Sequence, residues 1–239
     1  MKVHFEHRLL TCLLLLTAML AAGCSFSRSK GSTESSSSDS SGNSSKATTA
    51  FNPSTDARKD VVDALRKLKT AYPYRLTETA SATANGQIAM PESTRVVEFA
   101  AADRSHMRWT GGQGGDVEAI SIGAKHYWFE NGKWTEGTMP LSKGENRGED
   151  FANKLAEMVK EVKYVGPENL NGVSCFVYTC TFETTLSGQT YAGTSKVWIG
   201  ADDGLIHQSD SEFKVSSYAN KSHLVYEYNA NFKVEPPAM

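Results

Sequence analysis

The strongest constraint on the fold is an alternation of apolar and polar side chains that recurs from residue 74 almost to the C-terminus. Side chains of a strand point alternately to the two faces of a sheet, so this period indicates strands with one buried face. Short turn sequences separate the extended runs, as at Asn131-Gly132, Asp103-Arg104 and Asp202-Asp203-Gly204, with a looser turn at Gly111–Gly115. They predict an antiparallel meander. The candidate strands lie near 74–82, 87–90, 94–101, 105–110, 116–122, 124–130, 133–137, 162–166, 173–184, 192–200, 205–215 and 222–234.

Two segments have the helical period instead. Apolar residues recur at spacings of three and four within 54–72, where Ser54 to Asp56 can cap a helix and Pro73 ends it. A second stripe within 148–162 contains Phe151, Leu155, Met158, Val159 and Val162. Two helices on one side of a long antiparallel sheet predict an α+β fold. We interpret the charges of the first helix as a solvated face, with a lid or a membrane-facing surface as the alternative: Asp56, Arg58, Lys59, Asp60, Asp63, Arg66, Lys67 and Lys69.

The N-terminus has the order of a secretory signal. Basic Lys2 and Arg8 precede an apolar run over 9–20, and small residues follow up to Cys24. The run is shorter than the roughly 20 residues that a membrane-spanning helix needs. The ending Ala21-Ala22-Gly23-Cys24 resembles the lipobox of bacterial lipoproteins, which implies removal of residues 1–23 and a diacylglyceryl group on Cys24. An ordinary signal peptide followed by a chance cysteine is the alternative.

A serine-rich segment follows the expected lipidation site. Residues 25–50 contain almost no apolar side chains, so they cannot bury enough surface to offset the entropy lost on ordering. A flexible coil of this length spans roughly 30 Å, which suits a tether between the membrane and a domain. We therefore expect three parts: a signal peptide at 1–23, a lipidated cysteine with its tether at 24–50, and one domain at 51–239.

Several functional classes lack support in the sequence. The formal net charge is −2 and both signs are interspersed, which argues against a nucleic-acid partner. The domain's histidines, His106, His126, His207 and His223, do not follow a metal-ligand spacing. No phosphate loop or nucleophile elbow is present either. We therefore expect no catalytic residues, no metal and no cofactor, and classify the chain as a binding protein rather than an enzyme.

The domain's two cysteines are expected to remain reduced. Cys175 and Cys180 lie on one continuous candidate strand. Five residues at about 3.3 Å each separate their Cα atoms by roughly 16 Å, whereas a disulfide needs about 7 Å or less. The sequence therefore predicts two shielded thiols rather than a bridge.

The alternation also assigns side chains to faces. One face of the sheet is broad, aromatic and apolar, and two helices are too few to cover it, so we expect the sheet to curl round this face into a trough. Ligand pockets are concave and mostly apolar, which makes the trough a candidate binding site. The alternative is that the same side chains fill a plain core beneath the helices. The candidate lining residues are Met107, Trp109, Phe176, Tyr178, Phe182, Leu224, Tyr226 and Tyr228.

The order of motifs along 51–239 resembles the lipoprotein-carrier and lipoprotein-sorting superfamily, which includes LolA, LolB, the sensor RseB and the lipid-binding lipoproteins LppX and LprG. The resemblance implies an unclosed β-barrel of about 11 strands, with helices covering the concave side. It is carried by an amphipathic helix leading into Tyr74-Arg75-Leu76, the Asn131-Gly132 hairpin, the segments 164–173 and 196–205, Tyr226-Glu227-Tyr228-Asn229 and Pro236-Pro237.

The resemblance further implies a function in the cell envelope. The hollow would accept lipid or acyl chains, and the membrane would hold the protein through its N-terminal lipid. An anchored protein of this kind would be a fixed acceptor, donor or sensor rather than a soluble shuttle. The alternative is an envelope sensor or scaffold that binds a protein partner, such as a lipoprotein or a sensor protein, through the same fold. The anchor would lie on the outer membrane or on the outer face of the cytoplasmic membrane.

Overall fold

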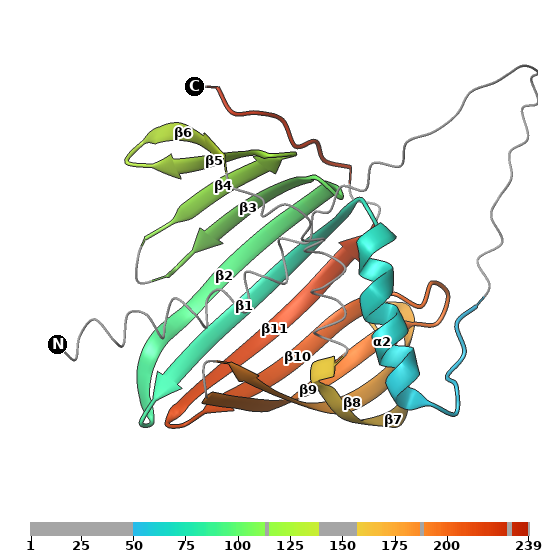
Figure 1. Cartoon of the computed structure of the whole chain (residues 1–239). Coiled ribbons are helices and arrows are strands. Elements are labelled where there is room, and N and C mark those ends of the chain that lie inside the picture. Colours follow the sequence, from blue (N-terminus) through green and yellow to red (C-terminus); the bar gives the residue numbers. More distant parts are fainter. Residues whose placement is uncertain (1–49, 113–114, 139–156, 187–188, 229–230, 239) are drawn as a thin grey trace, which may run out of the picture.

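The structure, a computed structural model, describes residues 50–112, 115–138, 157–186, 189–228 and 231–238. Eleven antiparallel strands form one sheet in the order β6-β5-β4-β3-β2-β1-β11-β10-β9-β8-β7 (Figure 1). Strands that follow each other in the sequence are neighbours in the sheet, except β6 and β7, which form its two edges, and β1 pairs with β11 in the middle. The strands are β1 (Tyr74–Ala84), β2 (Gln87–Ala101), β3 (Arg104–Thr110), β4 (Val117–Ile122), β5 (Lys125–Glu130), β6 (Lys133–Thr138), β7 (Val159–Leu170), β8 (Val173–Leu186), β9 (Gln189–Gly200), β10 (Ile206–Val215) and β11 (Tyr218–Tyr228).

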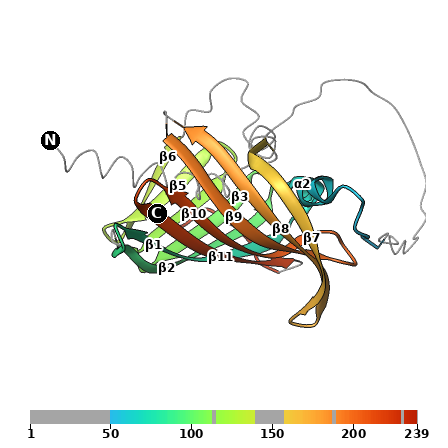
Figure 2. The same ribbon diagram turned by 90° about the horizontal axis from the view of Figure 1, so that it is seen from below.

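The sheet is bent into an arc that does not close, and helix α2 (Ala57–Lys67) lies inside the arc (Figure 2). We call the sheet face that packs against α2 the inner face and the opposite one the outer face. The helix begins at Asp56, whose side chain accepts a hydrogen bond from the Lys59 backbone N–H at 3.0 Å, and a short 3₁₀ turn, Leu68–Thr70, ends it before Pro73. This confirms the expected α+β fold with an unclosed antiparallel barrel.

The core lies between α2 and the inner face. Val61 and Ala64 of α2 pack against aromatic and aliphatic side chains from both halves of the sheet. The strand alternation expected from the sequence supplies these side chains, because alternate residues of each strand point inward. The buried members contributed by the sheet are Tyr74, Leu76, Val97, Phe99, Val159, Tyr178, Cys180, Val197, Ile199, Ile206, Leu224 and Tyr226.

The segments 87–90 and 94–101, expected as two strands, form the single strand β2. Pro91 lies where the register with β1 shifts, between the pairs Ala80–Ser93 and Ala82–Met90. A proline has no N–H to donate to a ladder, and a bulge is one of the few positions that accommodate it inside a sheet. The bulge keeps both halves of the strand in one ladder, which the sequence pattern did not reveal.

The prediction of a helix over 148–162 is wrong at the C-terminal end of that range. Val159 and Val162 belong to strand β7, and residues 148–156 lie outside the described ranges. A register shift between these two valines places Val159 opposite Phe182 and Val162 opposite Cys180. The bulge turns both valines toward the inner face, so a strand reproduces the spacing of three that is typical of a helix.

The last strand is shorter than expected. β11 ends at Tyr228, and the segment 231–238 is not part of the sheet. Phe232 and Val234 pack against Ile120 and Tyr127 in a second, smaller hydrophobic cluster. Because Ile120 pairs with His106 on the outer face, this cluster covers the outer face of β4 and β5.

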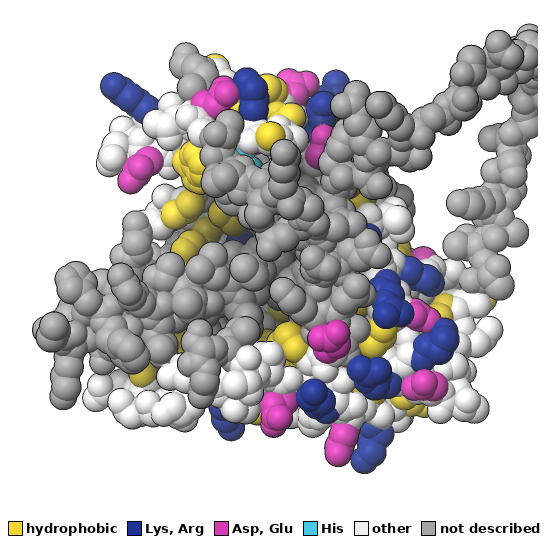
Figure 3. Space-filling view, viewed as in Figure 1, with side chains coloured by type: hydrophobic (Ala, Val, Ile, Leu, Met, Phe, Trp, Pro, Cys, Tyr) yellow, Lys and Arg dark blue, Asp and Glu magenta, His cyan; other side chains and the backbone are white. Residues whose placement is uncertain are grey.

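The charged residues of α2 are not all solvated. Lys, Arg, Asp and Glu side chains are interspersed over the α2 side of the molecule (Figure 3), and the exposed Lys59–Asp63 pair fits the expected solvated face. Asp60, however, is only 4% exposed and corrects that interpretation. It accepts hydrogen bonds from the Ser54 N–H and from the Tyr178 hydroxyl, both at 2.9 Å, so this charge faces the sheet.

Candidate ligand-binding face

The eight residues expected to line a trough all lie at inward-facing positions of their strands. Six of them belong to the core cluster described above: Met107, Phe176, Tyr178, Leu224, Tyr226 and Tyr228. The other two lie outside it. Trp109 is opposite Arg95, and Phe182 packs on Phe213 with ring centroids 4.2 Å apart. The pairing that brings these side chains to one face follows directly from the alternation in the sequence.

Aromatic rings dominate the end of the inner face nearest α2. Tyr74 is stacked on Phe99 with ring centroids 4.7 Å apart, and Tyr226 and Tyr228 lie nearly parallel at 6.5 Å. Burial raises the pKa values of the Tyr226 and Tyr228 hydroxyls, which therefore remain neutral at physiological pH. This end of the face is an uncharged aromatic surface, chemically suited to hydrocarbon.

Helix α2 is attached to the sheet by polar contacts as well as by packing. Tyr178, which is fully buried, donates its hydroxyl hydrogen to Asp60. The Arg58 guanidinium donates to the Val159 backbone carbonyl at 3.0 Å, and the Lys67 ammonium donates to the Asp203 carbonyl at 3.1 Å. These contacts join α2 to β8, to β7 and to the turn after β9.

The sequence interpretation missed an ion pair on the inner face. Glu78 and Arg95 are opposite each other on β1 and β2, and their charged atoms approach to 2.5 Å. Their side chains are 5% and 8% exposed, respectively. Burial raises the pKa of the Glu78 carboxyl, although Arg95 opposes that shift. The alternation of side chains could have revealed this pair from the sequence, because Glu78 points to the same face as Leu76 and Arg95 points to the same face as Val97.

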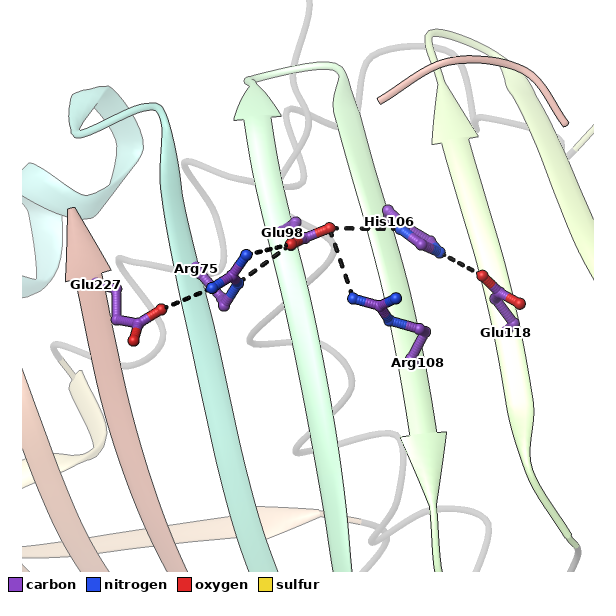
Figure 4. Close-up of polar contacts among 6 residues, drawn as sticks. All are labelled: Arg75, Glu98, His106, Arg108, Glu118 and Glu227. Atoms are coloured by element: carbon purple, nitrogen blue, oxygen red, sulfur yellow. Dashed lines mark hydrogen bonds and ion pairs between the residues drawn. The ribbon is translucent and has the colours of Figure 1, made fainter. Parts of the chain in front are cut away.

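The outer face carries a row of charges across five strands (Figure 4). Arg75 donates to Glu98 at 2.7 and 3.1 Å and to Glu227 at 3.1 Å. His106 lies between two carboxylates, with Nε2 2.7 Å from Glu118 and Nδ1 3.4 Å from Glu98. Glu227, Arg75 and Glu98 alternate in sign across three neighbouring strands, as expected for cross-strand pairs that stabilise a sheet.

A groove of about 960 Å³ is bordered by residues of β1, β2 and β7–β11, most of which point to the outer face. Most of its lining residues are polar or charged, among them Lys196, Asp210, Glu212, Lys221 and His223, and Ala80, Val162 and Cys180 also border it. His223 and Asp210 form an exposed pair across β10 and β11 at 2.5 Å. The groove therefore differs in both position and chemistry from the apolar trough expected on the inner face.

Both cysteines of the domain are unpaired and buried, as expected. Burial raises the pKa of each thiol to about 11. Among the described residues, no cluster of three or more His, Cys, Asp or Glu side chains has the arrangement of a metal site. In the same part of the chain, no helix has the length and apolar character needed to cross a membrane.

The described residues form an unclosed antiparallel sheet with a helix on its inner face, and the chain shares this fold with the solved structure of LprF. The chain is similar to LprF from Mycobacterium bovis, with a TM-score of 0.51 and 10% identity over 79% of this chain and 100% of that one. It is also similar to the Mycobacterium tuberculosis lipoprotein LppX, with a TM-score of 0.48 and 14% identity over 75% of this chain and 98% of that one. No family model and no curated protein matches the sequence.

Proposed function

We propose that this protein is a cell-envelope lipoprotein that binds lipid or acyl chains against the inner face of its sheet and takes part in lipid or lipoprotein handling. One observation carries the proposal. The apolar side chains of most strands belong to one cluster on one face of the sheet, which is the inner side of the arc in Figure 2. Within the described ranges, α2 is the only α-helix that packs on this face. The fold shared with LprF supports the same class of protein.

Lipid at Cys24 would hold this domain at the membrane. One acyl chain gives only marginal binding, whereas the two or three chains expected on a lipoprotein cysteine make release negligible. Cys24 and the tether lie outside the described residues. Metabolic labelling with a palmitate analogue should mark the wild-type protein and fail to mark Cys24→Ser. Label retained in the variant would overturn the proposed anchor.

The proposed driving force is burial of hydrocarbon. Each buried CH₂ contributes about 0.8 kcal/mol, so shortening a fatty acid by four methylenes should weaken binding by about 3 kcal/mol, or roughly 100-fold. Uptake of a fluorescent fatty acid, followed by competition with fatty acids of decreasing length, measures this slope. The protein for the assay is the chain from residue 24 onward carrying Cys24→Ser, purified without detergent.

Two neighbouring residues of β3 provide a matched pair of variants. Met107 faces inward and packs on the core cluster, whereas Arg108 faces outward and has a side chain that is 53% exposed. Met107→Gln should weaken fatty-acid binding, while Arg108→Gln, which introduces the same side chain on the other face, should leave it unchanged. Equal effects of the two changes, or no uptake and no co-purified lipid by native mass spectrometry, would refute lipid binding on the inner face.

A sensor or scaffold that binds a protein partner is the second candidate. The groove bordered by polar residues favours it, because protein interfaces have a polar, solvent-accessible rim. A charge reversal such as Lys196→Glu would then abolish capture of one specific envelope protein and leave fatty-acid uptake intact. If capture survives this change, the groove is not the docking surface.

A further inference from the structure

One end of the sheet presents an open edge. β6 is the outermost strand at that end, and within the described ranges no strand pairs with its other side (Figure 1). Its six residues pair with β5 from Glu130–Lys133 to Lys125–Thr138 without a register shift. A straight edge of this kind presents backbone N–H and C=O groups to which another extended chain can bind.

The turn between β5 and β6 determines which backbone groups point outward. The turn residues Asn131-Gly132 have positive φ values of 54° and 76°, as a two-residue hairpin turn requires. Such a turn closes on a hydrogen-bonded pair, here Glu130 and Lys133. Because hydrogen-bonded and non-hydrogen-bonded pairs alternate along an antiparallel ladder, the backbone groups of Trp134 and Glu136 point to the open side.

Aromatic side chains border this edge on both faces of the sheet. The register places Trp128 on the inner face, and Phe129 with Trp134 on the outer face. The rings of Phe129 and Trp134 lie 5.3 Å apart, and the Trp128 ring lies over Gly137 of β6, where an added Cβ would be 2.6 Å from it. Trp128 and Phe129 are 38% and 40% exposed. Apolar surface therefore remains accessible beside the edge.

The opposite edge of the sheet has features that prevent strand pairing. Two register shifts interrupt β7, and Lys160, Lys163 and Pro167 are exposed along it. Natural proteins use bulges, lysines and prolines to keep sheet edges from pairing with other chains. β6 has no bulge and no proline, and its single lysine, Lys133, is next to the hairpin turn. Of the two edges, β6 is the one that can accept a strand.

We propose that β6 is a docking edge for an extended segment of a partner protein, which adds a further strand to the sheet. A polypeptide in strand conformation is the occupant because its backbone presents N–H and C=O groups at the spacing of the ladder. Paired residues have their side chains on the same face. An apolar partner residue opposite Trp134 therefore lies against the Trp134 and Phe129 rings. The edge is separate from the inner face, so the proposal does not depend on lipid binding.

A short capped peptide is the probe. It alternates three valines with two threonines, has a lysine at each end and carries a fluorescein group. Anisotropy measures its binding to the chain from residue 24 onward carrying Cys24→Ser. With the valines on the face of Trp134, their amides point toward β6 and the threonine amides point to solvent. N-methylation of the valine amides should abolish binding, whereas N-methylation of the threonine amides should change the affinity by less than about 2-fold.

Hydrogen exchange followed by NMR locates the peptide on the protein. The amides of Trp134 and Glu136 should exchange rapidly in the free protein, because they point to the open side. Saturation with the unmethylated peptide should slow their exchange by about 10-fold or more. The amides of Lys133 and Thr135 point to β5 and should change little.

Glu136 provides a matched pair of variants. A proline is tolerated on an edge strand where its missing N–H would face solvent, so Glu136→Pro should preserve the hairpin and weaken peptide binding by about 10-fold. Glu136→Ala removes the same ion pair with Lys125 but keeps the N–H, and should bind the peptide as the wild type does. Fatty-acid uptake should be the same in both variants. The methylated peptides test the same contact without any change to the protein.

Three results would overturn the proposal. The first is equal binding of the two methylated peptides, and the second is equal affinity of Glu136→Pro and Glu136→Ala for the unmethylated peptide. The third is slowed exchange along β7 instead of β6. A concentration-dependent dimer that slows exchange at Trp134 and Glu136 without peptide would replace the partner protein with a second copy of this chain.

Discussion

Replacing Tyr178 with phenylalanine tests how α2 is held against the sheet. The Tyr178 ring is fully buried and its hydroxyl donates to Asp60, a carboxylate that is itself only 4% exposed. Phenylalanine keeps the ring and its packing and removes only the donor. Asp60 then retains the hydrogen bond from the Ser54 N–H but loses its partner on the sheet.

The size of the effect follows from the charge of the acceptor. A buried hydrogen bond to a charged group contributes about 1.5–3 kcal/mol, more than a bond between neutral groups. For a domain of this size a loss of about 2 kcal/mol lowers the melting temperature by roughly 4–8 °C. Tyr178→Phe should therefore melt several degrees below the wild type and unfold at a lower urea concentration, with the same slope m.

Tyr164 provides the control. Its ring centroid lies 5.4 Å from that of Tyr178, but the residue is 40% exposed. Tyr164→Phe removes a hydroxyl from the same neighbourhood and should change the melting temperature by less than about 2 °C, because exposed substitutions have small effects on stability. If both variants melt together with the wild type in differential scanning calorimetry, the Asp60 contact does not hold α2 in place.

Three further predictions concern single sites. Cys175 and Cys180, whose pKa values are raised to about 11 by burial, should resist alkylation at pH 8 in the Cys24→Ser chain and react fully in guanidinium, as mass spectrometry can show. At Asp203, burial raises the pKa, but the hydrogen bonds from His207 and the Leu205 N–H outweigh it and the net shift is downward. Its stabilising contribution is therefore present above the unfolded-state pKa of about 4 and lost at lower pH. Asp203→Asn should accordingly destabilise the protein more at pH 6 than at pH 3 in urea titrations. Gly193→Ala places a methyl group against the Glu212 carbonyl and the Phe182 ring and should cost about 1–3 kcal/mol of unfolding free energy; wild-type stability would contradict that close contact.

The sequence predicted the meander and its faces because alternation and turn residues are local signals. Asn131 adopts a positive φ of 54° at its hairpin, as an Asn-Gly turn requires. The bulges were not predictable, because a bulge interrupts the alternation from which the strands are inferred. A bulge such as that between Val159 and Val162 shifts the period by one residue and makes a strand resemble a helix. The bulge near Pro91 likewise divides β2 into the two candidate strands 87–90 and 94–101.

The binding face was predictable only in its apolar half. His106 and His223 point to the outer face, whereas the polar residues Glu78, Arg95 and Ser195 share the inner face with the apolar residues. The alternation along a strand places Ser195 on the same face as Val197, and Glu78 on the same face as Leu76. Alternation alone, however, cannot show whether such a polar side chain is buried or exposed to solvent. The distinction comes from pairing across strands, which joins residues separated by more than 100 positions, such as Ala80 and Ser222.

The contacts of α2 bear on how a ligand reaches the inner face. The helix is attached to β8 through Asp60, to β7 through Arg58 and to the turn after β9 through Lys67. Because lifting it would break all three contacts and expose Val61 and Ala64, we expect α2 to act as a fixed wall rather than a lid. Tyr178→Phe should then lower stability without changing the rate of fatty-acid uptake in stopped-flow fluorescence. If uptake becomes several-fold faster in this variant, movement of α2 limits entry and the helix is a lid.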